Sequence, residues 1–312
     1  MGAGRSKGES LEATSHAYSA SRSTEKDSRL RDLIIEGLRI VAPLSVALIM
    51  FAEALVIAPG KVVAAVRDRP GVMLRSLLAA LVLVPAAALA LILLLDPTPA
   101  VAVGIAILVA CPPAPLMLKT AKKLGGGDPA FMASLHLSLA ALAVVTVPAI
   151  LHALALQLGF RADVDTAALL SILAQTILLP IGLGLAVRAL FPAWAARFAP
   201  LLGTVGTVGL AIVVLALSTA LFPALLRMDG WSYAVIAAVG VAALAIGHWL
   251  GPKERAERTT LAVECAVRHP GLAVAIGTTN FTAQQALPVL LPCILTFMVT
   301  AMLYLFWRGR AS

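Results

Sequence analysis

Charged residues are scarce in this chain of 312 residues. Asp, Glu, Lys and Arg together make up 13% of it, whereas 60% of the residues are hydrophobic. A soluble domain contains about 25% charged residues, because its surface faces water. The scarcity of charge therefore excludes a water-soluble globular protein and indicates a chain that lies largely within a lipid bilayer.

Cysteine is also rare, and the common catalytic motifs are missing. The three cysteines (Cys111, Cys265 and Cys293) lie in apolar segments without paired spacing, so neither a disulfide framework nor a zinc site is expected. The sequence has no His-Glu-x-x-His motif, no paired intramembrane aspartates and no glycine-rich phosphate loop after a strand. We therefore expect no catalytic residues, no metal site and no cofactor other than a coupling ion, H⁺ or Na⁺.

Large apolar side chains are almost missing from residues 1–33, where Ser, Glu, Lys and Arg dominate. A stretch of this composition cannot bury a core, so we predict a disordered polar tail. It contains no apolar run followed by a cleavage site, and no signal peptide is expected. Residues 34–310 are predicted to form a transmembrane domain.

This domain is a series of apolar runs, each close to the ~20 residues that a membrane-spanning helix needs. Short polar or Pro/Gly connections separate the runs. We predict an all-α polytopic membrane protein with about nine transmembrane helices, at residues 36–57, 72–95, 98–124, 128–158, 166–190, 199–222, 231–251, 258–280 and 285–307.

Lysine and arginine produce the net charge of +8, and they cluster at the ends of the apolar runs. This distribution is typical of positive-inside anchoring and not of nucleic-acid binding. Most basic residues of the short connections fall on one side of the predicted alternation, which places the C-terminus in the cytoplasm and the N-terminus outside. The short loops and abundant Ala and Val suggest a bacterial inner membrane.

Two predicted helices are interrupted near their middle. The third contains Cys111-Pro112-Pro113-Ala114-Pro115, and the eighth contains Arg268-His269-Pro270-Gly271. Proline removes a backbone donor and clashes with the preceding turn, and glycine eases a bend, so both helices should break there. Because the two breaks lie five helices apart, the helices cross the membrane in opposite directions. Inverted-repeat transporters have this arrangement, although two ordinary kinked helices are the alternative.

Ionisable residues lie beside these breaks. A charge at membrane depth costs about 2.5–3.5 kcal/mol on insertion scales and is normally kept only along a pathway, so Glu264 and Arg268 favour a transport function. They can pair if the helix persists to Arg268, as part of the pathway or as a structural clasp. His136 and His269 make proton coupling conceivable. Glu53, in the first predicted helix, is also a carboxylate in apolar sequence but is not assigned to the site.

The interrupted segments resemble the bile acid:sodium symporter superfamily. Residues 104–117 are similar to its Gly/Cys/Pro-rich helix, and residues 263–273 are similar to its Glu-containing broken helix. Leu81–Pro85 and Asp68–Pro70 provide weaker matches. The resemblance extends over residues 36–307 in layout and over few positions in detail.

This resemblance implies a ten-helix inverted repeat that lacks its first helix. Two discontinuous helices would cross at the centre of a core formed by residues 72–158 and 231–307. The core would move against a panel formed by residues 36–57 and 166–222. The implied activity is secondary transport by alternating access.

The resemblance also implies that the family's sodium ligands are largely replaced. Glu264 is retained, but other residues stand at or near positions where relatives carry hydroxyl or amide groups: Ala80, Met117, Leu118, Met132, His136, Arg268 and His269. Sodium needs several oxygen ligands, which Ala, Met and Leu side chains lack. We expect the Arg268 guanidinium to provide the positive charge in place of a mobile cation.

The expected substrate is a small organic carboxylate or sulfonate, carried without sodium or with protons. Lys119, Arg268 and the helix N-termini at the breaks would attract an anion, although Lys119 is also explained as an interface anchor. One alternative is a metalloid-oxyanion efflux permease that uses Cys111 and Glu264. Another is an intramembrane enzyme that uses Glu264, Cys265 and His269. The expected partners are lipid and the anion but no nucleic acid, and a homodimer is left open.

Overall fold

The structure is a computed structural model that describes residues 37, 40–57, 60, 67–114, 129–159, 166–280 and 283–310. Within these ranges the secondary structure is helical, apart from an isolated antiparallel bridge. These ranges contain six long apolar helical stretches that can cross a bilayer: Pro70–Leu95, Ala133–Leu158, Ala167–Leu190, Pro192–Thr219, Gly230–Leu250 and Pro288–Gly309. Ile40–Val56 and Pro99–Ala110 are shorter apolar helices.

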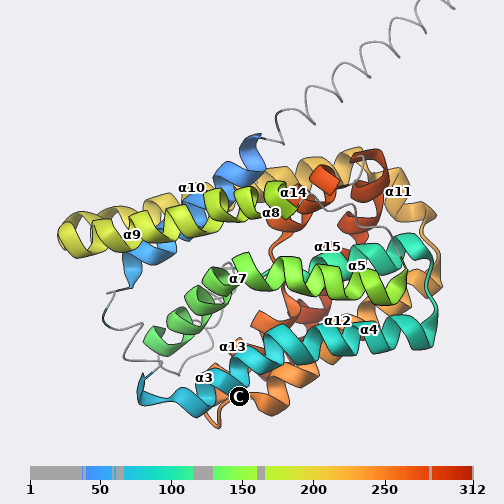
Figure 1. Ribbon diagram of the computed structural model, residues 1–312, viewed down its shortest axis with the longest axis horizontal. Helices are drawn as coiled ribbons and strands as arrows, with labels where there is room; N and C mark the ends of the chain where they lie inside the picture. The colour runs from blue at the N-terminus through green and yellow to red at the C-terminus, as the bar shows by residue number, and fades with distance from the viewer. Residues whose placement is uncertain are drawn as a thin grey trace, which may run out of the picture. The chain divides into compact units, whose positions relative to one another are not determined.

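The labelled helices follow one another along the chain as Figure 1 shows. Proline stands in the first turn of several of them, where its fixed φ suits the helix and its missing N–H has no helical partner. The elements are α3 (Pro70–Leu78), the π-helical turn η1 (Ala79–Leu83), α4 (Val84–Leu95), α5 (Pro99–Ala110), α7 (Pro129–Leu158), α8 (Thr166–Leu173), the π-helical turn η2 (Ala174–Leu178), α9 (Leu179–Leu190), α10 (Pro192–Ala220), α11 (Phe222–Arg227), α12 (Gly230–Leu250), α13 (Arg255–Ala266), α14 (Pro270–Asn280) and α15 (Ala283–Arg310).

The all-α class predicted from the apolar runs is confirmed. Most predicted segments lie within a few residues of a helix, but α10 begins at Pro192 and not at residue 199. The predicted segment 98–124 corresponds to α5 only as far as Ala110, and residues 115–128 lie outside the described part of the chain. The predicted segment 258–280 comprises α13 and α14. The predicted tail at residues 1–33 also lies outside the described residues.

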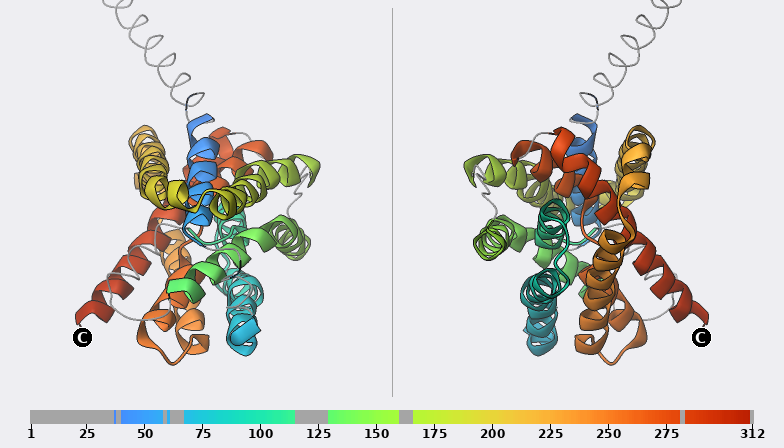
Figure 2. Two further views of the ribbon diagram at one scale, coloured as in Figure 1. Left: turned by 90° about the vertical axis from the view of Figure 1, so that its left-hand side faces the viewer. Right: turned by 90° about the vertical axis from the view of Figure 1, so that its right-hand side faces the viewer.

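The helix Ile40–Val56 packs closely against α9 and α10 through glycines. A Cβ at Gly184 of α9 would lie 2.6 Å from Cβ of Ala54, and a Cβ at Gly206 of α10 would lie 2.8 Å from Cγ1 of Ile49. Larger residues at these glycines would force the helices apart. We refer to Ile40–Val56, α9 and α10 as helix group 1; Figure 2 shows it in blue and yellow.

A second set of close contacts joins α5, α12, α13 and α15, which we refer to as helix group 2. A Cβ at Gly247 of α12 would lie 2.6 Å from Cα of Ala262 in α13. A Cβ at Gly240 of α12 would lie 2.8 Å from Oγ1 of Thr300 in α15. Gly104 of α5 likewise faces side chains of α15. The C-terminal ends of α5 and α13, which lie beside the proline-containing interruptions of the sequence, therefore belong to one tightly packed set of helices.

Candidate functional site

Two extended segments lie side by side at the ends of α5 and α13. Residues 111–114 follow α5, residues 267–269 separate α13 from α14, and the two segments form an antiparallel bridge. Their backbones exchange two hydrogen bonds of 2.9 Å: Ala114 N donates to Val267 O, and His269 N donates to Pro112 O. The pairing gives partners to buried backbone groups that have left the helical pattern.

Proline explains where both helices end. Pro112 and Pro113 follow the end of α5 at Ala110 and have no N–H to continue it. Pro270 is the first residue of α14, and a residue before proline is disfavoured in the α conformation, which keeps His269 extended. A Cβ at Gly271 would lie 2.8 Å from Cγ2 of Val46, so glycine permits the start of α14 to approach the helix Ile40–Val56. Pro115 lies outside the described residues.

The guanidinium of Arg268 is bound by backbone carbonyls. Arg268 is only 3% exposed. Its Nη1 donates to the carbonyl of Cys111 at 3.1 Å, and its Nη2 donates to the carbonyl of Ala80, in η1, at 3.0 Å. The Nε of Arg268 is buried and has no hydrogen-bond partner among the described residues. The side chain therefore connects the end of α5 to the π-helical turn.

The predicted pair of Glu264 and Arg268 requires a helix that continues to Arg268. Instead α13 ends at Ala266, and Arg268 lies in the extended segment. Among the described residues, the ion pairs and hydrogen bonds of Glu264 and Arg268 do not join these two side chains. The condition for the i, i+4 pair, a helix that persists to Arg268, is therefore not met, because Pro270 changes the backbone just before it.

Glu264 instead pairs with His136, which is completely buried on α7. The Nδ1 of His136 lies 3.2 and 3.0 Å from the two carboxylate oxygens of Glu264, which is 1% exposed. On the other side of the ring, Nε2 lies 3.1 Å from Oε2 of Glu53 in the helix Ile40–Val56. This second contact has the distance of an ion pair without the alignment of a hydrogen bond. One imidazole thus lies between two carboxylates from different helices.

The charges of this site balance only with an additional positive charge. Glu53 and Glu264 contribute two negative charges and Arg268 one positive charge, so a neutral His136 leaves a net charge of −1. Protonation of His136 brings the sum to zero. Because unbalanced buried charge is costly, the site favours a bound proton or cation.

His269 is a second buried imidazole in the site. Its Nδ1 accepts a hydrogen bond from the backbone N–H of Leu272 at 3.4 Å, which leaves the ring proton on Nε2. That Nε2 is buried and unpartnered within the described parts of the chain. His269 therefore presents a donor without an acceptor.

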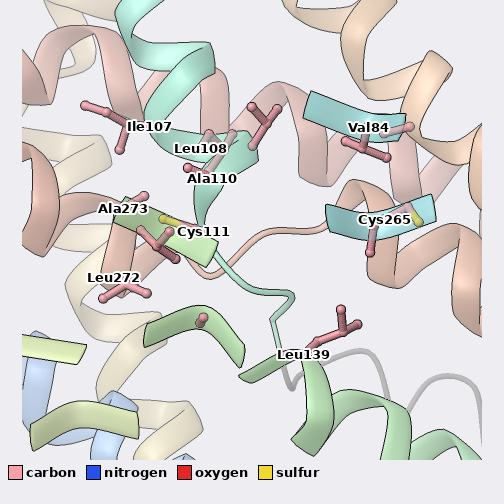
Figure 3. Packing of buried hydrophobic residues seen from close by; sticks show 14 of the residues in the cluster. Val84, Ile107, Leu108, Ala110, Cys111, Leu139, Cys265, Leu272 and Ala273 are labelled. Carbon is pink, nitrogen blue, oxygen red and sulfur yellow. The ribbon is translucent and has the colours of Figure 1, made fainter. Parts of the chain in front are cut away.

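Of the other predicted site residues, Cys111 contributes its carbonyl to the binding of Arg268, but its thiol does not take part in that contact. The thiol of Cys111 is completely buried in the apolar cluster that surrounds the end of α5, with Leu272 and Ala273 nearby (Figure 3). Lys119 falls among residues 115–128, which the structure does not describe. Within the described residues, no three His, Cys, Asp or Glu side chains are arranged to hold a metal ion.

Sequence reasoning left two contributors unassigned. Glu53 has a recognisable signal, a carboxylate in an otherwise apolar helix, but its partner is 83 positions away, at His136. Ala80 contributes through its carbonyl, and a backbone group leaves no trace in residue identity. The feature that marks Ala80 is its place in the π-helical turn, and this turn is visible only in the structure.

The sequence model of the sodium bile acid symporter family matches residues 43–222, which is more than half of the chain. The chain belongs to the sodium bile acid symporter family. The family comprises secondary transporters and not enzymes, so this multi-pass membrane protein is a secondary transporter. A search of individually curated proteins gives no match. The region matched to the sodium bile acid symporter family includes Glu53, Ala80 and His136, whereas Glu264 and Arg268 lie beyond it.

Proposed function

We propose that this chain transports a small organic anion, a carboxylate or a sulfonate, without sodium as the coupling ion. The observation that carries the proposal is the buried guanidinium of Arg268 on the carbonyls of Cys111 and Ala80. Backbone carbonyl oxygens are ligands that hard cations prefer, and here a fixed cation already occupies two of them. A mobile sodium ion at the same oxygens would compete with an arginine that cannot leave.

The unpaired donors support an anionic substrate. Nε of Arg268 and Nε2 of His269 are buried polar groups without a hydrogen-bond partner among the described residues. A buried donor left unpaired costs about 1–3 kcal/mol, and an anion that accepts from it removes this cost. α14 begins at Pro270, next to both side chains, and the partial positive charge of its N-terminus adds to the attraction.

The two sets of helices support a proposal of alternating access. We assign helix group 1 together with α8 to the panel, and residues 72–158 and 231–307, which include helix group 2, to the core. α5 and the α13–α14 pair act as the two discontinuous helices of an inverted repeat. The contacts of Gly271 with Val46 and of His136 with Glu53 lie between the proposed core and panel. Movement of one against the other would expose the extended segments to the two sides of the membrane in turn.

The positive-inside rule supports an orientation with the C-terminus in the cytoplasm. Arg188, Arg197, Arg255 and Arg308 belong to the predicted cytoplasmic set, and their placement near helix ends suits contact with anionic lipid headgroups. An inner-membrane location with an external N-terminus is part of the same proposal.

The experiment is a thermal-shift measurement on the purified protein with a panel of carboxylates and sulfonates, each in sodium and in potassium buffer. A ligand at 100 times its Kd stabilises the folded state by about 2.7 kcal/mol. We expect at least one anion to raise Tm equally in the two buffers. A shift that requires sodium would overturn the proposal.

Variants of Arg268 test whether the anion-dependent rise in Tm comes from binding near this guanidinium. Arg268→Gln should lose the anion-dependent shift, and Arg268→Lys, which keeps the charge but not the fork of donors, should retain part of it. Arg227→Gln is the matched control, because Arg227 is an exposed arginine of α11. An unchanged anion-dependent shift in Arg268→Gln would contradict the assignment.

A further inference from the structure

We propose that His136, held between Glu53 and Glu264, binds the proton that is coupled to transport. The inference rests on the proposed function, since it identifies the coupling ion of that transporter. Its basis is geometric: each ring nitrogen of His136 lies within 3.2 Å of a carboxylate oxygen. Both nitrogens can present an N–H to a neighbouring carboxylate only when both carry a proton.

The surroundings of the ring agree with a proton bound there. Helix α7 packs against α3, α4, α5, α8, η2 and α13. Of the titratable groups described in these elements and next to them, Glu53 and Glu264 interact directly with His136, and His269 interacts with it electrostatically. Arg268, Cys111 and Cys265 form the next layer, in which Arg268 interacts with Glu264. The two carboxylates are the groups in contact with the ring, and both favour the imidazolium.

The position of Glu53 links proton binding to movement. Glu53 comes from helix group 1, whereas His136 and Glu264 come from α7 and α13 in the proposed core. When the core moves against the panel, His136 keeps Glu264 but separates from Glu53. The ring then loses one of two negative neighbours, and it holds its proton less tightly. One conformation therefore binds the proton and the other releases it.

Exposure suggests the route by which the proton enters. The side chain of Glu53 is 17% exposed, whereas those of His136 and Glu264 are 0% and 1% exposed. Glu53 is the most accessible of the three groups, and its carboxylate can pass a proton to Nε2 of the ring. One proton moving with one monovalent anion transports no net charge, so the cycle is expected to be electroneutral.

The direct test is ¹⁵N NMR of histidine-labelled full-length protein in lipid nanodiscs at pH 7. His136 is assigned as the resonance that disappears in His136→Gln, and His152→Gln, an exposed histidine on the same helix, is the matched control. We expect both ring nitrogens of His136 to be protonated. A neutral ring in the wild-type protein would overturn the proposal whether or not the protein transports an anion.

Carboxylate variants sharpen the NMR test. Glu53→Gln should convert a substantial fraction of His136 to the neutral ring, whereas Glu254→Gln, which changes an exposed glutamate before α13, should leave the imidazolium unchanged. Neither variant removes the ring, so its state is measured in both. An imidazolium unaffected by Glu53→Gln would contradict the role of helix group 1.

A transport assay separates this inference from the proposed function. Proteoliposomes loaded with the pH indicator pyranine are exposed to benzenesulfonate, a strong acid that cannot carry its own proton across lipid. We expect interior acidification that His136→Gln abolishes and His152→Gln preserves. Uptake of the sulfonate without acidification would overturn proton coupling. Absence of uptake for every sulfonate and carboxylate in the panel would count against the proposed function, and the NMR result would still decide whether His136 holds a proton.

Discussion

Helix group 1 and helix group 2 distribute polar side chains differently. In helix group 1, α10 is largely exposed and presents a row of apolar side chains: Val205, Val208, Ile212 and Leu215. In helix group 2, α12 is more deeply buried, and its neighbour α13 buries Glu257, Thr259, Thr260 and Glu264. Lipid contact favours an apolar surface, whereas a helix surrounded by other helices can bury polar side chains.

Glu53 is an ionisable residue in the otherwise apolar helix Ile40–Val56. It lies in helix group 1, but its carboxylate faces His136 of α7. A lipid-facing helix would lose stability from a carboxylate, because a charge in hydrocarbon is costly. Its presence in this helix therefore points to a task that requires contact with α7.

Glu264→Gln should destabilise the protein most, because it removes one of the buried carboxylates of helix group 2. The amide oxygen of Gln can still accept from Nδ1 of His136 but carries no negative charge, and removing one charge of a buried ion pair costs about 3–5 kcal/mol. Glu53→Gln should cost less, because Glu53 is more exposed and its contact lacks hydrogen-bond alignment. Thermal unfolding of the two purified variants measures the difference. Equal losses of Tm would contradict this ranking of the two groups.

An intermediate effect is expected from Gly184→Leu, which disrupts the packing of helix group 1. A Cβ at Gly184 would lie 2.7 Å from the backbone oxygen of Phe51, so the helices must shift, at a cost of about 1–3 kcal/mol. Gly182→Leu is the control on the same helix, since a Cβ at Gly182 meets nothing within 4 Å. The measurement is the fraction of each variant that stays folded in detergent on heating. If Gly182→Leu is as damaging, close packing at Gly184 is not the cause.

Asp229→Ala should destabilise the protein least. Asp229 is the N-cap residue of α12. The Asp229 carboxylate accepts hydrogen bonds from the N–H and hydroxyl of Ser232, and these bonds lower the pKa of Asp229 below its usual 3.8. A lowered folded-state pKa stabilises the protein above the unfolded value, and the benefit is lost as pH falls through the folded value. Wild type should therefore exceed Asp229→Ala slightly in Tm at pH 6, with the gap closing below pH 3.8. A gap that widens in acid would contradict this account.

The sequence predicted most of the helices because their signal is local. Long apolar runs predict membrane-spanning helices. Pro112 follows the end of α5, and Pro270 is the first residue of α14. The early start of α10 was missed because Pro192 opens the helix ahead of Arg197, which was predicted to lie in a connection between apolar runs.

Which side chains of the site contact one another could not be predicted from local sequence. His136 and Glu264 are separated by 128 positions, and their contact depends on how α7 and α13 pack. The expected Glu264–Arg268 pair followed a helical spacing that Pro270 interrupts. His136, Arg268 and His269 were nevertheless identified as candidates, because ionisable residues in apolar sequence are few and conspicuous.

The binding of Arg268 by the carbonyls of Cys111 and Ala80 has a consequence for evolution. Every amino acid supplies a carbonyl, so substitutions at positions 80 and 111 can accumulate without removing either ligand. Only the backbone path and the arginine itself must be inherited. A relative with the same internal cation can therefore share almost no residues around it, and such relatives should be sought by the shape of the paired segments and not by the letters that form them.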